Sequence, residues 1–571
     1  MTANKQNEDF GRAALPRRQA DRQVSPTELV DASLRLPLLA LFGGAAFWLV
    51  VSSVLAMIAS IKFHAPDFLA HCPWLTYGRV QPAADDALLY GFCIPAGLGV
   101  ALWLFAQLGQ APLRGAVVPV VAAKLWHLGV LVGLAGILSG NSTGFAWLEF
   151  PRAGSVILFF AYLLLALWAT MNFAARRERA LYPSHWFLVA ALFWFPWIYS
   201  TANLFLVAWP VRGVVQAIIG WWFVNNLLYV WLALAGIGVA FYFLPKFSGR
   251  PLQSYYLALF AFWTLILFGT WCGIPPGAPV PAWMPVLSSY AAVLTVVPVI
   301  AVAAIMWKTL RGPTSGRNIT PASLSSPSAN EVGGEGQGEV ARLNSNPLAP
   351  SPLPAQAGRG SRQQSQAAPP TNCEPKGGPF CFIRFGLISF VLSSLMLIAM
   401  ECPRISAVTE FTWFGPAQTQ LQLYGFFAMT MFGAIYYLLP RAVGFELPFP
   451  KLARLHFWIS VPGVVLLVLP LAIGGVEQGM KLNNPDIAFL EATKAALFFF
   501  RFSTVGLLFI LMGNLLFALN IFAMTFLWKL SLIKKVAALV KAPLPATDAS
   551  ASLPTSPGFD ATRRRDKEVK A

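Results

Sequence analysis

The sequence predicts an all-α integral membrane protein with about twelve transmembrane helices. Hydrophobic residues make up 57% of the 571 residues and charged residues only 11%, whereas a soluble domain carries about 25% charged residues. Uncharged runs such as 36–61 and 213–244 are longer than the roughly 18 to 25 apolar residues that cross a bilayer. Basic residues gather in the tails and short loops, which is typical of a membrane protein.

Apolar stretches between charged residues and Pro or Gly breaks give the individual helices. In order, they are predicted at 36–61, 86–109, 117–138, 153–174, 185–209, 213–244, 254–273, 283–309, 379–400, 414–440, 453–473 and 497–528. Loops after even-numbered spans are the more basic ones, so we expect both termini in the cytoplasm, with the chain in the inner membrane of a bacterium.

Three segments are predicted to lie outside the membrane. Residues 313–377 are rich in Pro, Ser and Gln, a composition that cannot bury enough apolar surface to order itself. We interpret this segment as a disordered linker between helices 1–8 (36–312) and helices 9–12 (378–530). Residues 1–35 and 531–571 are interpreted as disordered, basic cytoplasmic tails.

The charge and the cysteines exclude several functions. The net charge of +17 lies in loops and tails rather than on one face, which argues for the lipid bilayer as partner and against nucleic acid. The six cysteines include no CxxC or CxxCH pattern, so the sequence signals neither a zinc site nor a covalently attached c-type heme.

Several segments carry a family resemblance. They are "PWLTYGRVQP" (73–82), the stretch from "GWWFVNNLLYVW" to "LFAFWTLI" (220–266), and "GFFAMTMFGAIYYLLPRAVG" (425–444) followed by "LHFWIS". Their order and spacing resemble the catalytic subunit of the C-family (cbb-type) heme-copper oxidases, and more loosely the large subunit of nitric oxide reductase. The resemblance covers all twelve spans and leaves out the linker and tails.

The resemblance implies two b-type hemes and one copper held by six histidines. Two of these form an H-x-H pair on helix 10, where residues two apart point about 200° apart and so serve different hemes. In this chain the matching positions hold other residues. Ala84 stands at the low-spin heme position of helix 2, Gln418 and Gln420 at the helix-10 pair, and Asn225, Pro275 and Pro276 at the copper positions; Gly269 replaces the family's tyrosine.

These substitutions predict that no heme, copper or other metal is bound and that no catalytic residue is retained, because methyl groups, prolines and neutral amides are poor ligands for copper or heme iron. The chain has five histidines, all favoured as structural: His64, His71, His127, His185 and His456. We expect bulky side chains to fill part of the former cofactor space, namely Trp413, Phe414, Trp222 and Phe223.

Other polar residues allow two interpretations each. Asp85 and Asp86 would open the second helix, where capping of the helix dipole is favoured over a proton relay. Gln418 and Gln422 share a helix face and Gln420 points away; together with Asn225 and Asn226, they suit interhelical hydrogen bonds better than a hydrated cavity. Arg501 lies inside a predicted span and is expected to need a partner.

The sequence therefore predicts a relative of cytochrome c oxidase subunit I that has lost oxygen-reduction chemistry, a pseudoenzyme acting as a subunit or partner in a respiratory electron-transport complex. Candidate partners are c-type cytochrome subunits or an active oxidase. Two alternatives stay open. One is an active terminal oxidase or nitric oxide reductase with relocated ligands, and the other is a transporter or proton conductor using the emptied cavity, with Pro275–Pro276 breaking helix 7.

Overall fold

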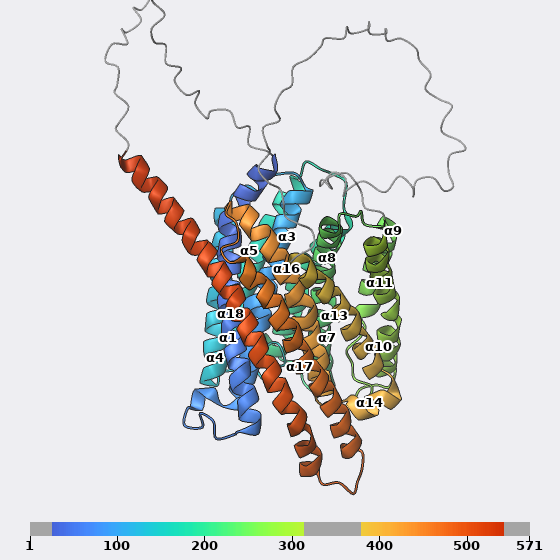
Figure 1. Ribbon diagram of the computed structural model, residues 1–571. Helices are drawn as coiled ribbons and strands as arrows, with labels where there is room; N and C mark the ends of the chain where they lie inside the picture. The colour runs from blue at the N-terminus through green and yellow to red at the C-terminus, as the bar shows by residue number, and fades with distance from the viewer. Residues whose placement is uncertain (1–25, 313–377, 542–571) are drawn as a thin grey trace, which may run out of the picture. The chain divides into compact units, whose positions relative to one another are not determined.

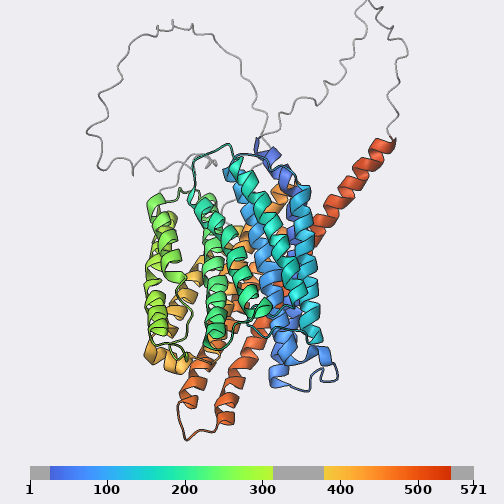
Figure 2. The same cartoon turned by 180° about the vertical axis from the view of Figure 1, so that it is seen from behind.

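The computed structural model of the chain describes residues 26–312 and 378–541, and every regular element in those ranges is helical (Figures 1 and 2). Within them, eleven helices are long and apolar enough to cross a membrane, and Tyr255–Gly269 is a further, shorter apolar helix. The predicted all-α membrane fold is confirmed.

The first block contains seven candidate spans and the shorter apolar helix α9. They are α1 (Pro26–His64), a helix made of α2 (Tyr77–Asp86), η2 (Ala87–Cys93) and α3 (Ile94–Leu108), α4 (Val117–Ser139), α5 (Arg152–Ala174), α6 (Pro183–Ala202) with η3 (Asn203–Ala208), a helix made of α7 (Val214–Asn225), η4 (Asn226–Trp231) and α8 (Leu232–Ser248), α9 (Tyr255–Gly269), and α10 (Trp283–Leu294) with α11 (Val296–Arg311). A short helix, η1 (Pro73–Leu75), precedes α2.

The second block contains four spans. They are α13 (Pro379–Met400), a helix made of α15 (Phe414–Gln420), η5 (Leu421–Ala428) and α16 (Met429–Val443), α17 (Pro450–Leu482) and α18 (Phe489–Lys541), with the short α14 (Pro403–Thr409) after α13. The predicted linker 313–377 lies outside the described residues.

The predicted tails, 1–35 and 531–571, include residues that the structure places in helices. Residues 26–35 belong to α1, where Val30 and Leu34 are buried, so this turn is held by packing that composition alone does not show. Residues 531–541 continue α18, because this stretch has no Pro or Gly and consists mainly of helix formers. Residues 1–25 and 542–571 lie outside the described residues.

Three of the long helices change their winding midway. Their π-helical segments η2, η4 and η5 begin three, one and one residues after Ala84, Asn225 and Gln420, respectively. Wide turns of this kind are rare and occur often at functional sites. In this chain they follow directly on the positions matched to metal ligands.

A buried carboxylate joins the start of α1 to two other helices. Asp31 is 6% exposed, and its Oδ1 accepts hydrogen bonds from Trp103 Nε1 at 2.9 Å and Gln107 Nε2 at 2.7 Å on α3. Its Oδ2 lies 3.7 Å from Arg441 Nε on α16. The residues predicted as tail therefore anchor the first helix.

We predict that Asp31→Ala lowers the thermal midpoint of the detergent-purified protein clearly, because Trp103 and Gln107 each lose a charged acceptor, at a cost of about 2 kcal/mol or more in total. Glu477→Ala breaks the exposed pair with Lys481 (37% and 36% side-chain exposure) and should cost at most about 1 kcal/mol. Equal midpoints for the two variants would contradict the anchoring role.

Candidate functional site

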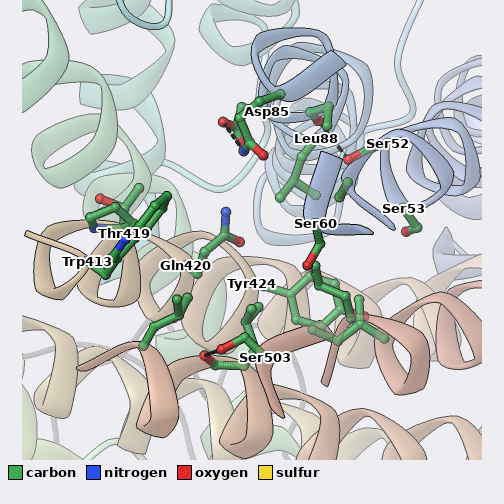
Figure 3. Close-up of a pocket in the computed structure, with 18 of the residues that line it drawn as sticks. Ser52, Ser53, Ser60, Asp85, Leu88, Trp413, Thr419, Gln420, Tyr424 and Ser503 are labelled. Carbon is green, nitrogen blue, oxygen red and sulfur yellow. Dashed lines mark hydrogen bonds between the residues drawn. The ribbon is translucent and has the colours of Figure 1, made fainter. Parts of the chain in front are cut away.

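A cavity of about 400 Å³ lies among α1, α2, α15, η5, α17 and α18 (Figure 3). Its polar lining consists of hydroxyl and amide groups and a single carboxylate: Ser52, Ser53, Ser60, Tyr77, Gln81, Asp85, Thr419, Gln420, Tyr424, Ser503 and Asn514. A polar hollow of this kind inside a transmembrane bundle is a candidate functional site.

Ala84 and Gln420 both line this cavity, so the fold brings the two positions matched to the low-spin heme ligands to one space. Ala84 offers only a methyl group there, and its carbonyl accepts a hydrogen bond from Ser52 Oγ at 2.8 Å. Gln420 points into the cavity (Figure 3) and has no hydrogen bond within residues 26–312 and 378–541. Neither side chain presents an imidazole.

Asp85 and Asp86 were predicted to cap the second helix, and this prediction is wrong. The helix begins at Tyr77, eight residues before Asp85. The prediction started it too late because the first turns of the helix are polar. Asp85 lines the cavity and accepts a hydrogen bond from Gln81 Nε2 at 2.8 Å. Asp86 is buried (1% exposed), and neither of its oxygens has a hydrogen-bond donor in the described residues.

Glu149, in the loop between α4 and α5, completes a group of three carboxyls with these two aspartates. Burial and the negative charge of Asp85 raise the pKa of Glu149 to about 7, although hydrogen bonding to the backbone opposes the shift. Near neutral pH this group can gain or lose a proton at Glu149.

The second site, around Asn225 at one of the positions matched to copper ligands, is closed rather than hollow. Asn225 Nδ2 donates to the carbonyl of Gly269 at 2.8 Å, and Gly273 packs so closely that a Cβ there would lie 2.5 Å from Asn225 Cβ. The remaining space, a cavity of about 30 Å³ lined by Asn225, Gly269 and Gln422, has room for about one water molecule.

Gln418 lies beside Tyr229, which lines the second cavity, and both polar atoms of its side-chain amide are hydrogen-bonded. Tyr229 donates its hydroxyl to Gln418 Oε1 at 2.7 Å, and Gln418 Nε2 donates to the carbonyl of Ser393 at 3.1 Å. Ser393 Oγ donates in turn to Gln422 Oε1 at 2.5 Å. As predicted, Gln418 and Gln422 share one side of the helix and Gln420 lies on the other.

Pro275 and Pro276 lie in the loop after α9 and line neither cavity. The helix-7 break proposed for a transporter is therefore wrong, because α9 already ends at Gly269. After the helix, Gly273 (φ 101°) packs against Asn225, and the prolines begin a turn in which the Ala278 N–H donates to the Pro275 carbonyl at 3.0 Å.

Two of the five histidines have clear structural roles. His456 is fully buried and hydrogen-bonds through Nδ1 to the Tyr436 hydroxyl at 3.0 Å. His185 is buried, and its Nδ1 accepts from the backbone N–H of Tyr182 at 3.1 Å, which closes the first turn of α6.

The other three histidines lie apart from both cavities. His127 packs against Gly44 of α1, where an added Cβ would meet the ring at 2.1 Å. His64 ends α1 and His71 lies in the loop that follows. Within the described residues no group of three or more His, Cys, Asp or Glu side chains could hold a metal ion.

Of the bulky side chains expected to fill cofactor space, only Trp413 lines the larger cavity, where its ring packs edge-on against Phe63 and Phe500 at 5.0 and 4.5 Å. Trp222 contacts Trp197, and Phe223 lies near Tyr199; Phe414 lines neither cavity. Arg501 is exposed on α18 and has no ion pair in the described ranges.

Sequence reasoning missed Tyr229, Ser393 and Glu149. A tyrosine and a serine in apolar helices carry no pattern that marks them, because their partners lie 189 and 29 residues away. Glu149 had a usable signal, since it is an acidic residue close to a predicted span. Glu401 was missed in the same way; burial raises its pKa to about 7, against a hydrogen bond from Ser289.

The residues at these two positions do not fit the family's cofactors. The family holds its hemes and copper with imidazoles, and the lining of both cavities contains no histidine. The one thiol in the second lining, Cys272, donates to the Phe268 carbonyl at 3.3 Å. The amide of Gln418 is committed to Tyr229 and Ser393. About 30 Å³ at the second position leaves no room for a porphyrin.

The fold and the arrangement of these positions define a multi-pass membrane protein of the oxidase subunit I class. The family model "Cytochrome C and Quinol oxidase polypeptide I" matches residues 37–334 and 372–529. The chain belongs to this family, which confirms the resemblance to heme-copper oxidase subunit I.

Curated relatives agree with this assignment. The chain is 22% identical over 501 residues to a cytochrome c oxidase subunit 1 homolog of Azorhizobium caulinodans, covering 84% of this chain and 80% of that protein. It is also 22% identical to the cbb3-type cytochrome c oxidase subunit CcoN1 of Stutzerimonas stutzeri (79% and 86%) and to cytochrome c oxidase subunit 1 of Rhodobacter capsulatus (89% and 88%). Bacterial relatives and apolar helices together indicate a bacterial membrane protein.

Among solved structures, a heme-copper terminal oxidase dimer shares the fold, with a TM-score of 0.59 at 15% identity, covering 87% of this chain and 84% of that chain.

We predict that Gln418→Ala lowers the thermal midpoint, because the Tyr229 hydroxyl and the Ser393 carbonyl each lose a buried partner, at about 1 to 3 kcal/mol in total. Gln420→Ala, two residues along the same helix, removes no such bond and serves as the matched control. Thermal unfolding followed by circular dichroism measures both, and an equal or larger loss for Gln420→Ala would contradict the network.

We predict that the thermal midpoint falls as the pH rises from about 5 to about 8. The pKa of Glu149 is raised from 4.5 to about 7, so the folded state binds this proton more tightly, and that stabilisation is lost as the pH rises through the folded-state value. Glu149→Gln should flatten the profile, whereas Glu477→Gln should leave it unchanged. A Glu149→Gln profile as steep as that of the unmodified protein would refute the assignment.

Proposed function

We propose that this chain is a non-catalytic homologue of oxidase subunit I, which keeps the fold and has lost oxygen reduction. One observation carries the proposal. Around the positions matched to the copper and second heme ligands, Tyr229, Gln418, Ser393 and Gln422 bond to one another, and Asn225 donates to the Gly269 carbonyl. Side chains that bond to one another in this way can stabilise the bundle without a metal.

The proposed role is that of a subunit or partner in a respiratory membrane complex. Its relatives are named as subunits of cytochrome c oxidases, and we propose that this chain associates in a complex of the same kind. The proposed partners are c-type cytochrome subunits or an active oxidase. We place the chain in the bacterial inner membrane with both termini in the cytoplasm, because the basic loops follow the even-numbered spans.

An active oxidase or nitric oxide reductase would need relocated ligands, and the positions of the five histidines, apart from both cavities, argue against it. A solute-binding or transport function is the stronger second candidate, because the larger cavity is both polar and hollow.

The first test is the reduced-minus-oxidised visible spectrum of the purified full-length protein, with iron and copper measured in the same sample. We expect no heme bands and less than about 0.1 iron or copper per chain, because the donor set lacks imidazole. A cbb-type subunit I purified in the same detergent controls for cofactor loss. Near-stoichiometric heme in this chain would overturn the proposal.

The second test concerns the partners. Affinity purification from native membranes is expected to recover c-type cytochromes, visible as covalent heme on a denaturing gel. Purification with the tag on an unrelated multi-pass protein is the control. Recovery of this chain alone, while an active oxidase from the same membranes retains its subunits, would contradict the subunit role and leave the solute-binding function.

A further inference from the structure

We propose that the cavity beside Ala84 and Gln420 binds a small organic cation, with a protonated amine held by Asp85 and Gln420 and an apolar body lying against Trp413. This inference goes beyond the proposed function, since a non-catalytic subunit could exist with or without a bound solute.

Charge selects the class of ligand. Asp85 is the only ionisable carboxylate of the cavity lining, and no lysine, arginine or histidine lines it. In the described part of the chain Asp85 has no ion pair, and the nearby Arg79 turns away to donate to the carbonyls of Pro73 and Leu138. A carboxylate inside a membrane bundle is costly unless a cation accompanies it. An anionic ligand would be repelled by Asp85 and would find no cationic side chain in the lining.

Hydrogen-bonding capacity places the charged group. Gln81 occupies one oxygen of Asp85, at 2.8 Å from Oδ2, which leaves Oδ1 for a ligand. Across the same space, the side-chain amide of Gln420, the last residue of α15, has no hydrogen-bond partner in residues 26–312 and 378–541. Figure 3 shows this side chain pointing into the cavity. An ammonium group carries three donors and suits these two acceptors.

The rest of the lining selects an organic body over a bare ion. The volume of about 400 Å³ is far larger than one hydrated ion needs and falls in the range of small-molecule sites. One wall is apolar: Leu88, Leu467, Leu471, Phe500, Leu507 and Ile510. Trp413, fixed edge-on by Phe63 and Phe500, adds an aromatic surface that favours a cation.

The backbone of the α4–α5 loop gives an independent sign of function. Trp147 also lines the cavity, and its φ of 64° is rare for a bulky residue. The conformation is held by Tyr90, which donates its hydroxyl to the Trp147 carbonyl at 2.5 Å. Strain of this kind persists mainly where it positions a functional side chain.

The experiment uses the purified full-length protein and protonated 2-phenylethylamine as the probe, with uncharged 2-phenylethanol as its isostere. We expect the amine to raise the thermal midpoint and to quench tryptophan fluorescence saturably, and the alcohol to do neither. Asp85→Asn should weaken amine binding at least about tenfold. Asp86→Asn, which removes the neighbouring carboxyl but leaves the lining intact, should retain binding.

If Asp85→Asn does not fold, Gln420→Leu keeps the carboxylate and should weaken binding several-fold. Equal shifts with amine and alcohol would overturn the proposal in favour of an apolar pocket. Sodium or potassium that reproduces the shift and blocks the amine would overturn it in favour of an inorganic cation site, and no saturable response to the amine would also overturn it. The heme spectrum of the same sample tests the proposed function separately.

Discussion

Inside a transmembrane bundle a buried polar side chain is stabilised by partners within the protein, and the side-chain amide of Gln418 links three helices in this way. It accepts from Tyr229 on η4 and donates to the backbone of Ser393 on α13, while Ser393 reaches Gln422 one turn further along. These bonds set how closely the three helices approach. The distance that they fix leaves about 30 Å³ at the second position, so closure of that site follows from satisfying the amides.

The opposite face of the same helix is different. Gln420 is rotated away from the network and meets α1, α2 and α18 across a polar hollow. Within two residues the chain thus has one site that is closed by its own side chains and one that stays open. The open site contains the Asp85 carboxylate and the side-chain amide of Gln420, which has no hydrogen-bond partner in the described residues, whereas the side chains around the closed site bond to one another.

The fold was largely predictable because uncharged runs of bilayer length admit few structures other than helices. The residues at which helices begin and end were harder to predict. The start of α1 is held by the contacts of Asp31 with α3 and α16, and no local pattern reveals such partners. The same limit explains the error at Asp85 and Asp86, since polarity was taken for a helix end. The relation of Gln418, Gln420 and Gln422 was predictable from helix geometry alone, whereas Tyr229 and Glu149 required the tertiary structure.

The π-helical segments that follow Ala84, Asn225 and Gln420 have a consequence for how the family can change. A wide turn changes the direction in which the following side chains point, so the residues before and after it pack against different helices. The two halves of each helix can then vary independently. A substitution just before a π-helical segment can therefore change the contacts of one half of the helix while the other half keeps its packing.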